Sequence, residues 1–255
     1  MTAISEAVIL MAGEGSRLRQ GYGGQARLRG ADQTFLKPFV PVLGRPLISY
    51  VLDTLTRAGI KTLNFVVGYE SKRMIVQLTP LIPSGLGACF IENRDWQKQN
   101  GISLLIAADH VAEPFLLTMS DHLFDDTIVN QLLDSFDPDF LNVAVDRKLD
   151  SIFDLEDAMK VRIQRKLVTD IGKNLSDYDA IDIGLFICPL EIFDYLERAK
   201  SLTGAKDCSL ADGVQLMAGD DKVRAVDIGD GWWQDVDTPQ MLERAEKTIR
   251  APATS

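Results

Sequence analysis

Hydrophobic residues recur along the chain in two patterns. Short, nearly continuous apolar runs cover residues 7–12, 63–68, 87–93, 114–119, 139–146 and 180–187. Runs of this length and composition predict buried strands rather than helices. Between the early runs, apolar positions recur at helical spacing in residues 47–58 and 70–78. This strand–helix alternation predicts an α/β fold with a Rossmann-like, doubly wound sheet, mixed but mainly parallel and joined by right-handed crossovers.

Helical spacing returns later in the chain. After an expected turn at Asn100-Gly101 it covers residues 102–110, 190–200 and 209–217. The 255 residues show no internal repeat, low-complexity tract or linker, and this length suits one large α/β domain. We therefore expect one domain over residues 1–255, with only residues 251–255 as a tail.

The composition is that of an acidic globular protein. The formal net charge of −10 argues against non-specific nucleic-acid binding. Cys89, Cys188 and Cys208 form neither a CxxC motif nor a disulfide framework, and His110 and His122 are too few for a histidine-rich metal site. No apolar run reaches the ~20 residues of a membrane span, and the N-terminus lacks a signal-peptide pattern. A reducing cytoplasm is the expected compartment, and nothing in the sequence indicates an oligomeric state.

A glycine-rich loop, Gly13-Glu14-Gly15-Ser16-Arg17, follows the first predicted strand. Such a loop lets backbone N–H groups approach an anion, and an arginine in it pairs well with phosphate. The loop is neither of the two familiar phosphate motifs. Leu18 stands where the dinucleotide fingerprint needs its third glycine, and no Gly-Lys-Ser/Thr occurs for a P-loop.

Carboxylates follow two other predicted strands. Asp121 follows residues 114–119 after Ser120, at the carboxyl end where open parallel sheets bind ligands. Asp235 and Asp237 project from one face if the chain is extended there. Because Mg²⁺ prefers oxygen ligands, these three residues are candidate metal ligands. The plainer alternative for the second group is a turn before a helix capped by Thr238.

Arg17-Leu18, Lys37-Pro38 and Gly44-Arg45-Pro46-Leu47 occur in that order. Together they resemble the signature of the nucleotidyltransferases that activate sugar phosphates and alcohol phosphates. The resemblance covers nearly the whole chain. It implies a nucleotide-diphospho-sugar transferase-like fold with a nucleotide-binding half near residues 1–122 and an acceptor-binding half near residues 123–250. It also implies catalytic roles for Arg17 and Lys37 at the phosphates of a nucleoside triphosphate.

The resemblance implies binding roles for further residues. Nucleotide contacts are expected from Ala12, Gly13, Gly15, Ser16 and Ser120, and more loosely from Asn100, Gly101 and Ser103. For the last three, an ordinary helix cap is the alternative. Lys160 resembles a catalytic lysine that contacts the acceptor's phosphate, and a solvated lysine at a strand edge is its alternative. Gly184 would let a substrate lie near the backbone.

Within this superfamily the chain looks most like the inositol-1-phosphate cytidylyltransferases. The residues that carry this likeness are Met119-Ser120-Asp121-His122, Glu156 to Val161 and Asp235 to Pro239. Those enzymes use CTP and make CDP-inositol, and they are often fused to a membrane-embedded CDP-alcohol phosphotransferase. This chain lacks such a domain, so the expected downstream enzyme is a separate protein. A sugar-1-phosphate, phosphocholine or a phosphonate is an alternative acceptor, and another nucleotide is an alternative donor.

The implied chemistry is Mg²⁺-dependent, in-line attack of the acceptor's phosphate on the α-phosphorus of CTP, with release of pyrophosphate. Residues 19–36 form a longer segment than the family usually shows, and their glycines and arginines suggest a mobile lid. This extension leaves open a different class of function, a nucleotide-binding regulator without turnover. A hydride-transferring Rossmann enzyme is disfavoured by Leu18.

Overall fold

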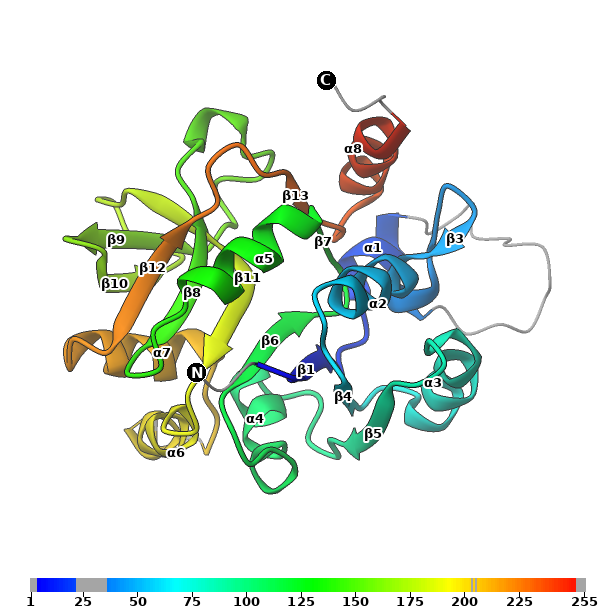
Figure 1. The fold of residues 1–255 in the computed structure, drawn as a ribbon, viewed down its shortest axis with the longest axis horizontal. Helices are drawn as coiled ribbons and strands as arrows, with labels where there is room; N and C mark the ends of the chain where they lie inside the picture. Colours follow the sequence, from blue (N-terminus) through cyan, green and yellow to red (C-terminus); the bar gives the residue numbers. More distant parts are fainter. Residues whose placement is uncertain (1–3, 22–35, 203, 205, 251–255) are drawn as a thin grey trace.

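The computed structural model describes residues 4–21, 36–202, 204 and 206–250. The predicted lid therefore lies largely outside the described residues. A twisted nine-stranded sheet forms the centre (Figure 1). Its strands lie in the order β5 (Gly87–Glu92), β4 (Thr62–Val67), β1 (Glu6–Met11), β6 (Phe115–Met119), β11 (Ala180–Cys188), β8 (Leu141–Asp146), β12 (Val223–Asp227), β10 (Leu167–Gly172) and β9 (Lys160–Gln164).

The sheet is mixed, as predicted, but it is not mainly parallel: of the eight neighbouring pairs in the strand order of the described residues, four are parallel and four antiparallel, and three of the parallel pairs lie in the first half. Strands β5, β4, β1 and β6 are all parallel, whereas β11 runs antiparallel to both β6 and β8. Strands β9 and β10 form a hairpin that the sequence patterns do not predict. Its turn residues, Arg165 and Lys166, have φ values of +51° and +74°, and positive φ at both central positions is typical of two-residue hairpin turns.

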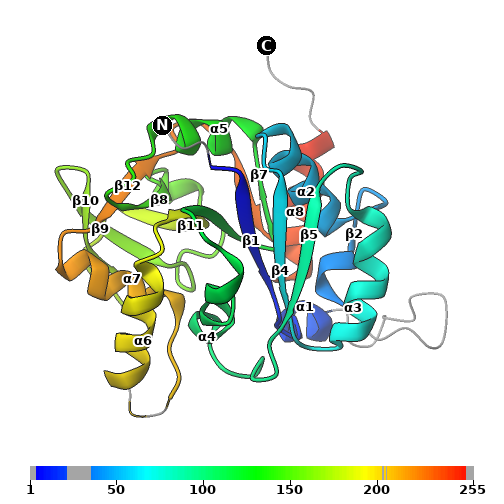
Figure 2. The ribbon, with the colours of Figure 1, turned by 60° about the horizontal axis from the view of Figure 1, so that its bottom comes forward.

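Helices cover both faces of the sheet. One face carries α2 (Leu47–Arg57), α3 (Ser71–Leu78) and α5 (Asp126–Ser135), and the other carries α4 (Asn100–Leu105), α6 (Ile192–Leu202) and α7 (Leu210–Gly219). Figure 2 shows α4, α6 and α7 on one side of the strands and α2 and α3 on the other. Alternate residues of β1 enter the two resulting cores: Val8 and Leu10 face one, Ile9 and Met11 the other. Burial on both faces explains why this strand is an unbroken apolar run.

Several predicted helix boundaries are wrong in detail. Helix α4 begins at Asn100, so Asn100-Gly101 is its first turn, and it ends at Leu105. A short 3₁₀ turn, η3 (Ala108–His110), replaces the rest of the expected helix. The Asn100 side chain accepts a hydrogen bond from the Leu210 backbone N–H at 2.8 Å, which joins the first turn of α4 to the first turn of α7.

Two small elements outside the main sheet position the site. Strand β7 (His122–Phe124) pairs antiparallel with β13 (Trp233–Asp235), beside α8 (Pro239–Arg250), which begins after Thr238 as predicted (Figure 1). A third apolar cluster, which packs the first loop against the C-terminal segment, contains Leu18, Val40, Val42, Leu47, Leu123, Val236, Leu242 and Ala245. Short β2 (Pro41–Val42), β3 (Arg45–Pro46), α1 (Ser16–Gly21) and η1 (Lys37–Phe39) complete this end.

None of the helices in the described part of the chain has the length and apolar character needed to cross a membrane.

Candidate active site

The glycine-rich loop folds over the side chain of Lys37. Gly15 has a φ of +66°, and a Cβ at this position would lie 2.7 Å from the Cβ of Lys37. Only glycine leaves room for this crossing. Ala12, Gly13, Gly15 and Ser16 line a cavity of about 370 Å³, and Ser120 lines it from the end of β6. The glycine-rich loop therefore forms one wall of the cavity, and its backbone can offer N–H groups to an anion.

Lys37 is the central charge of this cavity. Its ammonium contacts both Asp121 and Asp237, and its side chain is 9% exposed. Burial opposes the charge on Lys37, but the two carboxylates outweigh burial and raise its pKa. For Asp121, burial is likewise outweighed, and Lys37 and His122 hold the pKa of that carboxyl well below its usual range. Lys37 and Asp121 are therefore both charged at neutral pH.

The β7–β13 ladder brings three predicted carboxylates together. Asp235 lies opposite His122 in its register, and the Val236 N–H donates to the Asp121 carbonyl at 3.0 Å. The His122 ring stacks on Trp233 at 6.4 Å between centroids, and its Nδ1 lies 2.7 Å from Oδ1 of Asp121. Residues about 115 positions apart in sequence thus form one side of the site through main-chain pairing.

These carboxylates partly fit a divalent metal ion. Oxygens of Asp121 and Asp237 converge on one cationic point, the Lys37 ammonium. Asp235 lines the second cavity together with Asp237. Within the described residues, no three His, Cys, Asp or Glu side chains are arranged to hold a metal by themselves. Mg²⁺ is often held by one or two carboxylates together with substrate phosphates. The donor set fits an ion of that kind.

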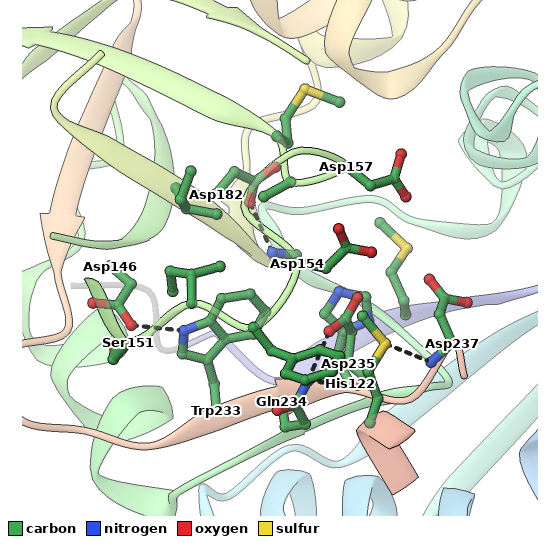
Figure 3. Close-up of a pocket in the computed structure, with 18 of the residues that line it drawn as sticks. His122, Asp146, Ser151, Asp154, Asp157, Asp182, Trp233, Gln234, Asp235 and Asp237 are labelled. Atoms are coloured by element: carbon green, nitrogen blue, oxygen red, sulfur yellow. Dashed lines mark hydrogen bonds between the residues drawn. The ribbon is translucent and has the colours of Figure 1, made fainter. Parts of the chain in front are cut away.

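A second cavity of about 480 Å³ adjoins the first (Figure 3). Figure 3 shows the carboxyl groups of Asp154, Asp157, Asp182 and Asp235 around it. Burial raises the pKa of Asp182 to about 7, although the Gly184 N–H donates to its carboxyl group. The cavity wall also holds Trp233, whose Nε1 donates to Asp146 at 2.8 Å. Many hydrogen-bond acceptors with apolar patches between them suit a ligand with several hydroxyl groups.

Arg17 and Asp237 line both cavities. The Arg17 guanidinium contacts Asp237 on one side and Asp157 on the other. Burial lowers the pKa of Arg17 less than these carboxylates raise it. Arg17 is thus a fixed positive charge where the two cavities meet.

Three predicted nucleotide contacts lie on or next to α4. Asn100 and Ser103 line the first cavity, while the Ser103 hydroxyl also accepts a hydrogen bond from Asn93 at 2.9 Å. A Cβ on Gly101 would meet the carbonyl oxygen of Cys208 at 2.5 Å. Gly101 therefore permits close packing of α4 against the segment before α7, and this packing accounts for the glycine without a ligand.

Lys160 is buried rather than solvated, so the strand-edge alternative is wrong. Its ammonium donates to the carbonyl oxygens of Lys173 at 2.7 Å and Glu156 at 3.0 Å. Among the described residues, those that line either cavity include Lys173 but not Lys160. The contact of Lys160 with an acceptor stays a prediction that this geometry does not favour.

Gly184 lines the second cavity and interrupts β11 with a φ of +74°. A Cβ there would lie 2.7 Å from the His122 ring. The space left by the missing side chain is therefore used by His122.

Sequence reasoning did not single out His122, Trp233, Lys173 or Asp157 as site residues. His122 and Asp157 lie inside segments that carry the family resemblance, and Trp233 lies two residues before Asp235, so these positions were an available signal. Lys173 follows β10 in an ordinary polar stretch. Nothing in its local sequence distinguishes it.

The chain matches the model of the MobA-like NTP transferase domain family over residues 7–175. It therefore belongs to that family, and its fold is that of a nucleotidyltransferase domain. This agrees with the superfamily inferred from the glycine-rich loop and Lys37-Pro38.

Individual relatives point in the same direction. The chain is 32% identical over 251 residues to the bifunctional IPC transferase and DIPP synthase of Rubrobacter xylanophilus, covering 98% of this chain and 53% of that protein. The protein of the same name from Aquifex aeolicus is 28% identical, with 96% and 52% covered. The chain thus spans about half the length of these relatives. The inositol-1-phosphate CTP transferase from T. maritima superposes with a TM-score of 0.81 at 25% identity, covering 97% and 96% of the two chains.

Proposed function

We propose that this chain transfers the cytidylyl group of CTP to inositol-1-phosphate, giving CDP-inositol and pyrophosphate. One observation carries the proposal. Arg17 and Asp237 line both the cavity of the glycine-rich loop and the acidic cavity beside it. A nucleotide in the first cavity and a phosphorylated alcohol in the second would meet at this pair. The similar structure from T. maritima is named as an inositol-1-phosphate CTP transferase, and this name supports inositol phosphate and CTP as the substrates.

The reaction needs no covalent intermediate. A phosphate oxygen of the acceptor forms a bond to the α-phosphorus of CTP, and the bond from that phosphorus to the β-phosphate bridging oxygen breaks. The acceptor oxygen is already anionic, so no general base is required. Catalysis then depends on positioning and on neutralising charge.

Each basic residue has a role in that scheme. Backbone N–H groups of the Gly13–Ser16 loop and the Arg17 guanidinium would hold the triphosphate. Lys37 would exchange a carboxylate partner for a phosphate oxygen at the reacting centre. Asp121 with Asp235 or Asp237 would hold Mg²⁺, which neutralises phosphate charge when bound.

The acidic cavity favours an acceptor with many hydroxyl groups. Asp146, Asp154, Asp182 and Asp230 line it, and carboxyl oxygens accept hydrogen bonds from hydroxyls. A sugar-1-phosphate shares that chemistry and is the nearest alternative acceptor. A CDP-alcohol phosphotransferase is the class of enzyme that would use the product.

Pyrophosphate release tests the proposal directly. The purified protein is assayed with Mg²⁺ and each of CTP, UTP, GTP, ATP and dTTP against inositol-1-phosphate, glucose-1-phosphate, phosphocholine and a phosphonate. Release with CTP plus inositol-1-phosphate alone is the expected result. Release with another pair would keep the mechanism and replace the substrates. Nucleotide binding without release from any pair would support a non-catalytic regulator instead.

A further inference from the structure

Strand β5 forms an open edge of the nine-stranded sheet. It pairs with β4 on one side, at the end of the row of strands, and no strand in the described part of the chain pairs with its other side (Figure 2). The opposite end of the sheet differs, because its last strand, β9, also pairs with β11. An unpaired edge presents backbone N–H and C=O groups that can pair with a strand of another chain.

The backbone of β5 suits such a pairing. The Gly87 N–H donates inward to the Lys61 carbonyl at 2.8 Å, and backbone groups alternate in direction along a strand. Ala88 and Phe90 therefore turn their N–H and C=O groups outward. Natural edge strands are often blocked by proline, lysine or a β-bulge. The sequence of β5, Gly-Ala-Cys-Phe-Ile-Glu, contains no proline or lysine, and its register with β4 is uninterrupted.

Cys89, in the middle of β5, contacts a histidine from another element. Its Sγ atom lies 3.6 Å from Nδ1 of His110, which belongs to the 3₁₀ turn η3. Both side chains reach the surface, since Cys89 is half-buried and His110 is exposed. In a tetrahedral zinc site, bonds of about 2.3 Å to sulfur and about 2.0–2.1 Å to nitrogen place these two atoms about 3.6 Å apart. The pair therefore has the spacing of two ligands of one Zn²⁺ ion.

Two ligands are half of a closed zinc site, which takes four. Among the described residues, no third His, Cys, Asp or Glu side chain joins the pair to hold a metal. A two-fold axis at the open edge would supply the missing half. An antiparallel pairing of two copies of β5, centred on Cys89, sets the outward groups of Ala88 on one copy against those of Phe90 on the other. Because directly opposed residues share a face of the sheet, both Cys89–His110 pairs would then lie together.

We propose that two copies of this chain pair edge to edge through β5 and hold one Zn²⁺ ion between them, with Cys89 and His110 of each copy as its four ligands. Two sulfur and two nitrogen ligands in a tetrahedron favour zinc, and each thiol releases its proton as the metal binds. A ladder of two short strands is marginally stable by itself, so the metal makes the dimer. The proposed function does not enter this inference, because the described residues that line the two cavities include none from β5.

The mass of the protein in solution tests the inference. Sedimentation velocity is run on the reduced wild type in EDTA and then with half an equivalent of Zn²⁺ per chain. We expect a monomer in EDTA, a dimer with zinc, and one bound ion per two chains by elemental analysis. Co²⁺ in place of zinc should give the charge-transfer absorption of a thiolate ligand. One ion per chain without a dimer, or a dimer that EDTA does not change, would overturn the inference.

Variants at the metal pair test the ligands. Cys89→Ser and His110→Gln should stay monomeric with Zn²⁺ and lose the thiolate absorption with Co²⁺. Asp109→Asn is the matched control, because Asp109 is an exposed carboxylate beside His110 and should leave both readouts unchanged. Loss of the metal in Asp109→Asn would place the ion on a single chain and contradict the shared site.

A variant at the edge tests the strand pairing. Ala88→Pro removes an outward N–H and no hydrogen bond to β4, so it should prevent the zinc-dependent dimer, with thermal unfolding to confirm that the variant is folded. Ala88→Ser keeps that N–H and should dimerise like the wild type. Dimerisation of folded Ala88→Pro at wild-type strength would rule out pairing through β5.

The register has a readout that needs no variant to fold. Opposed residues at the centre of this pairing have Cα atoms about 4.5 Å apart, within the range of about 4.4–6.8 Å for a disulfide. Diamide, which takes two electrons and two protons from a pair of thiols, should link metal-free wild-type chains through Cys89. Cys188 and Cys208 are buried, so they should stay reduced. Peptide mapping that finds no Cys89–Cys89 link would contradict this register.

Discussion

Lys37 combines burial with two carboxylate neighbours, and this combination suits a cation that must act on phosphate. Its ammonium already sits where negative charge converges, so a phosphate meets a preorganised charge rather than one that must be ordered first. Asp182 differs from Lys37, because its surroundings favour the neutral form of the side chain rather than the charged form. Burial raises its pKa to about 7 and outweighs the opposing effects of the Gly184 N–H and His122.

Lys37→Ala should lower kcat by ~10² or more, the effect of losing one electrostatic stabiliser. Pyrophosphate release at saturating substrates measures it, with thermal unfolding to check that the variant is folded. Lys247→Ala is the control, because Lys247 is an exposed partner of Glu243 on α8 and should keep normal turnover. Near-normal turnover of Lys37→Ala would remove Lys37 from the mechanism.

Asp182→Asn should stabilise the protein more at pH 8 than at pH 5. The pKa of Asp182 rises from 3.8 to about 7 on folding, so the folded state holds its proton more tightly. Wild-type stability therefore falls as pH rises from about 4 to 7, by up to ~1.4 kcal/mol per unit. Asparagine has no such proton and keeps an acceptor for the Gly184 N–H. Thermal melts at both pH values test this, and a stabilisation no larger at pH 8 would contradict it.

At the scale of elements, the β7–β13 ladder assembles the site. It places His122 against Asp235 and lets Val236 bond the carbonyl of Asp121. Neither strand exceeds three residues. The ladder depends on the third apolar cluster behind it and on the space that Gly184 leaves for the His122 ring.

Gly184→Ala should destabilise the protein by about 2 kcal/mol or more and reduce turnover. A left-handed conformation costs an alanine at position 184 roughly 1–2 kcal/mol. Its Cβ would also displace the His122 ring. Urea unfolding measures the first effect. Gly219→Ala is the control, since nothing lies within 4 Å of a Cβ there, and it should be neutral or stabilising by ~0.4–1 kcal/mol. Equal stability of both variants would show that the crossing of β11 and His122 tolerates a side chain.

Over the whole molecule, a net charge of −10 opposes the approach of CTP and an acceptor phosphate. The cations that offset it are gathered at the junction of the two cavities, where each is paired with a carboxylate in the described structure. Substrate phosphates would take the place of the carboxylates at these cations, and the metal ion would take the place of the cations at these carboxylates. The substrates and the metal ion should therefore bind cooperatively.

CTP with Mg²⁺ should raise the Tm more than CTP with EDTA. A ligand whose free concentration is 100 times its Kd stabilises the folded protein by ~2.7 kcal/mol. For a chain of this size, that free energy corresponds to a rise in Tm of about 5–10 °C. Without the metal, Asp121 and Asp237 would face phosphate charge after Lys37 turns to the nucleotide. Thermal shift at constant ionic strength measures both conditions, and Asp121→Asn should abolish the difference between them. The same shift with and without Mg²⁺ would show that these carboxylates do not bind the ion.

Local sequence was sufficient for β1, β4, β5, β6, β8 and β11 and for the glycine-rich loop. Burial of β1 on both faces requires an unbroken apolar run, and the close crossing over Lys37 requires glycine at position 15. Both requirements are visible in neighbouring residues, so the α/β class and the residues at the glycine-rich loop followed from the sequence. The β9–β10 hairpin, the β7–β13 ladder and the true start of α4 did not, because each depends on partners distant in the chain.

The same division applies to the site. The sequence by itself determined which residue types are available for phosphate and metal: Arg17, Lys37, Asp121, Asp235 and Asp237. Only the tertiary structure decided that Lys173 lines the acidic cavity and Lys160 does not, because both are lysines at the ends of strands. The difference between them is the set of backbone carbonyls that the fold places around Lys160, and no local pattern encodes contacts between segments that meet only after folding.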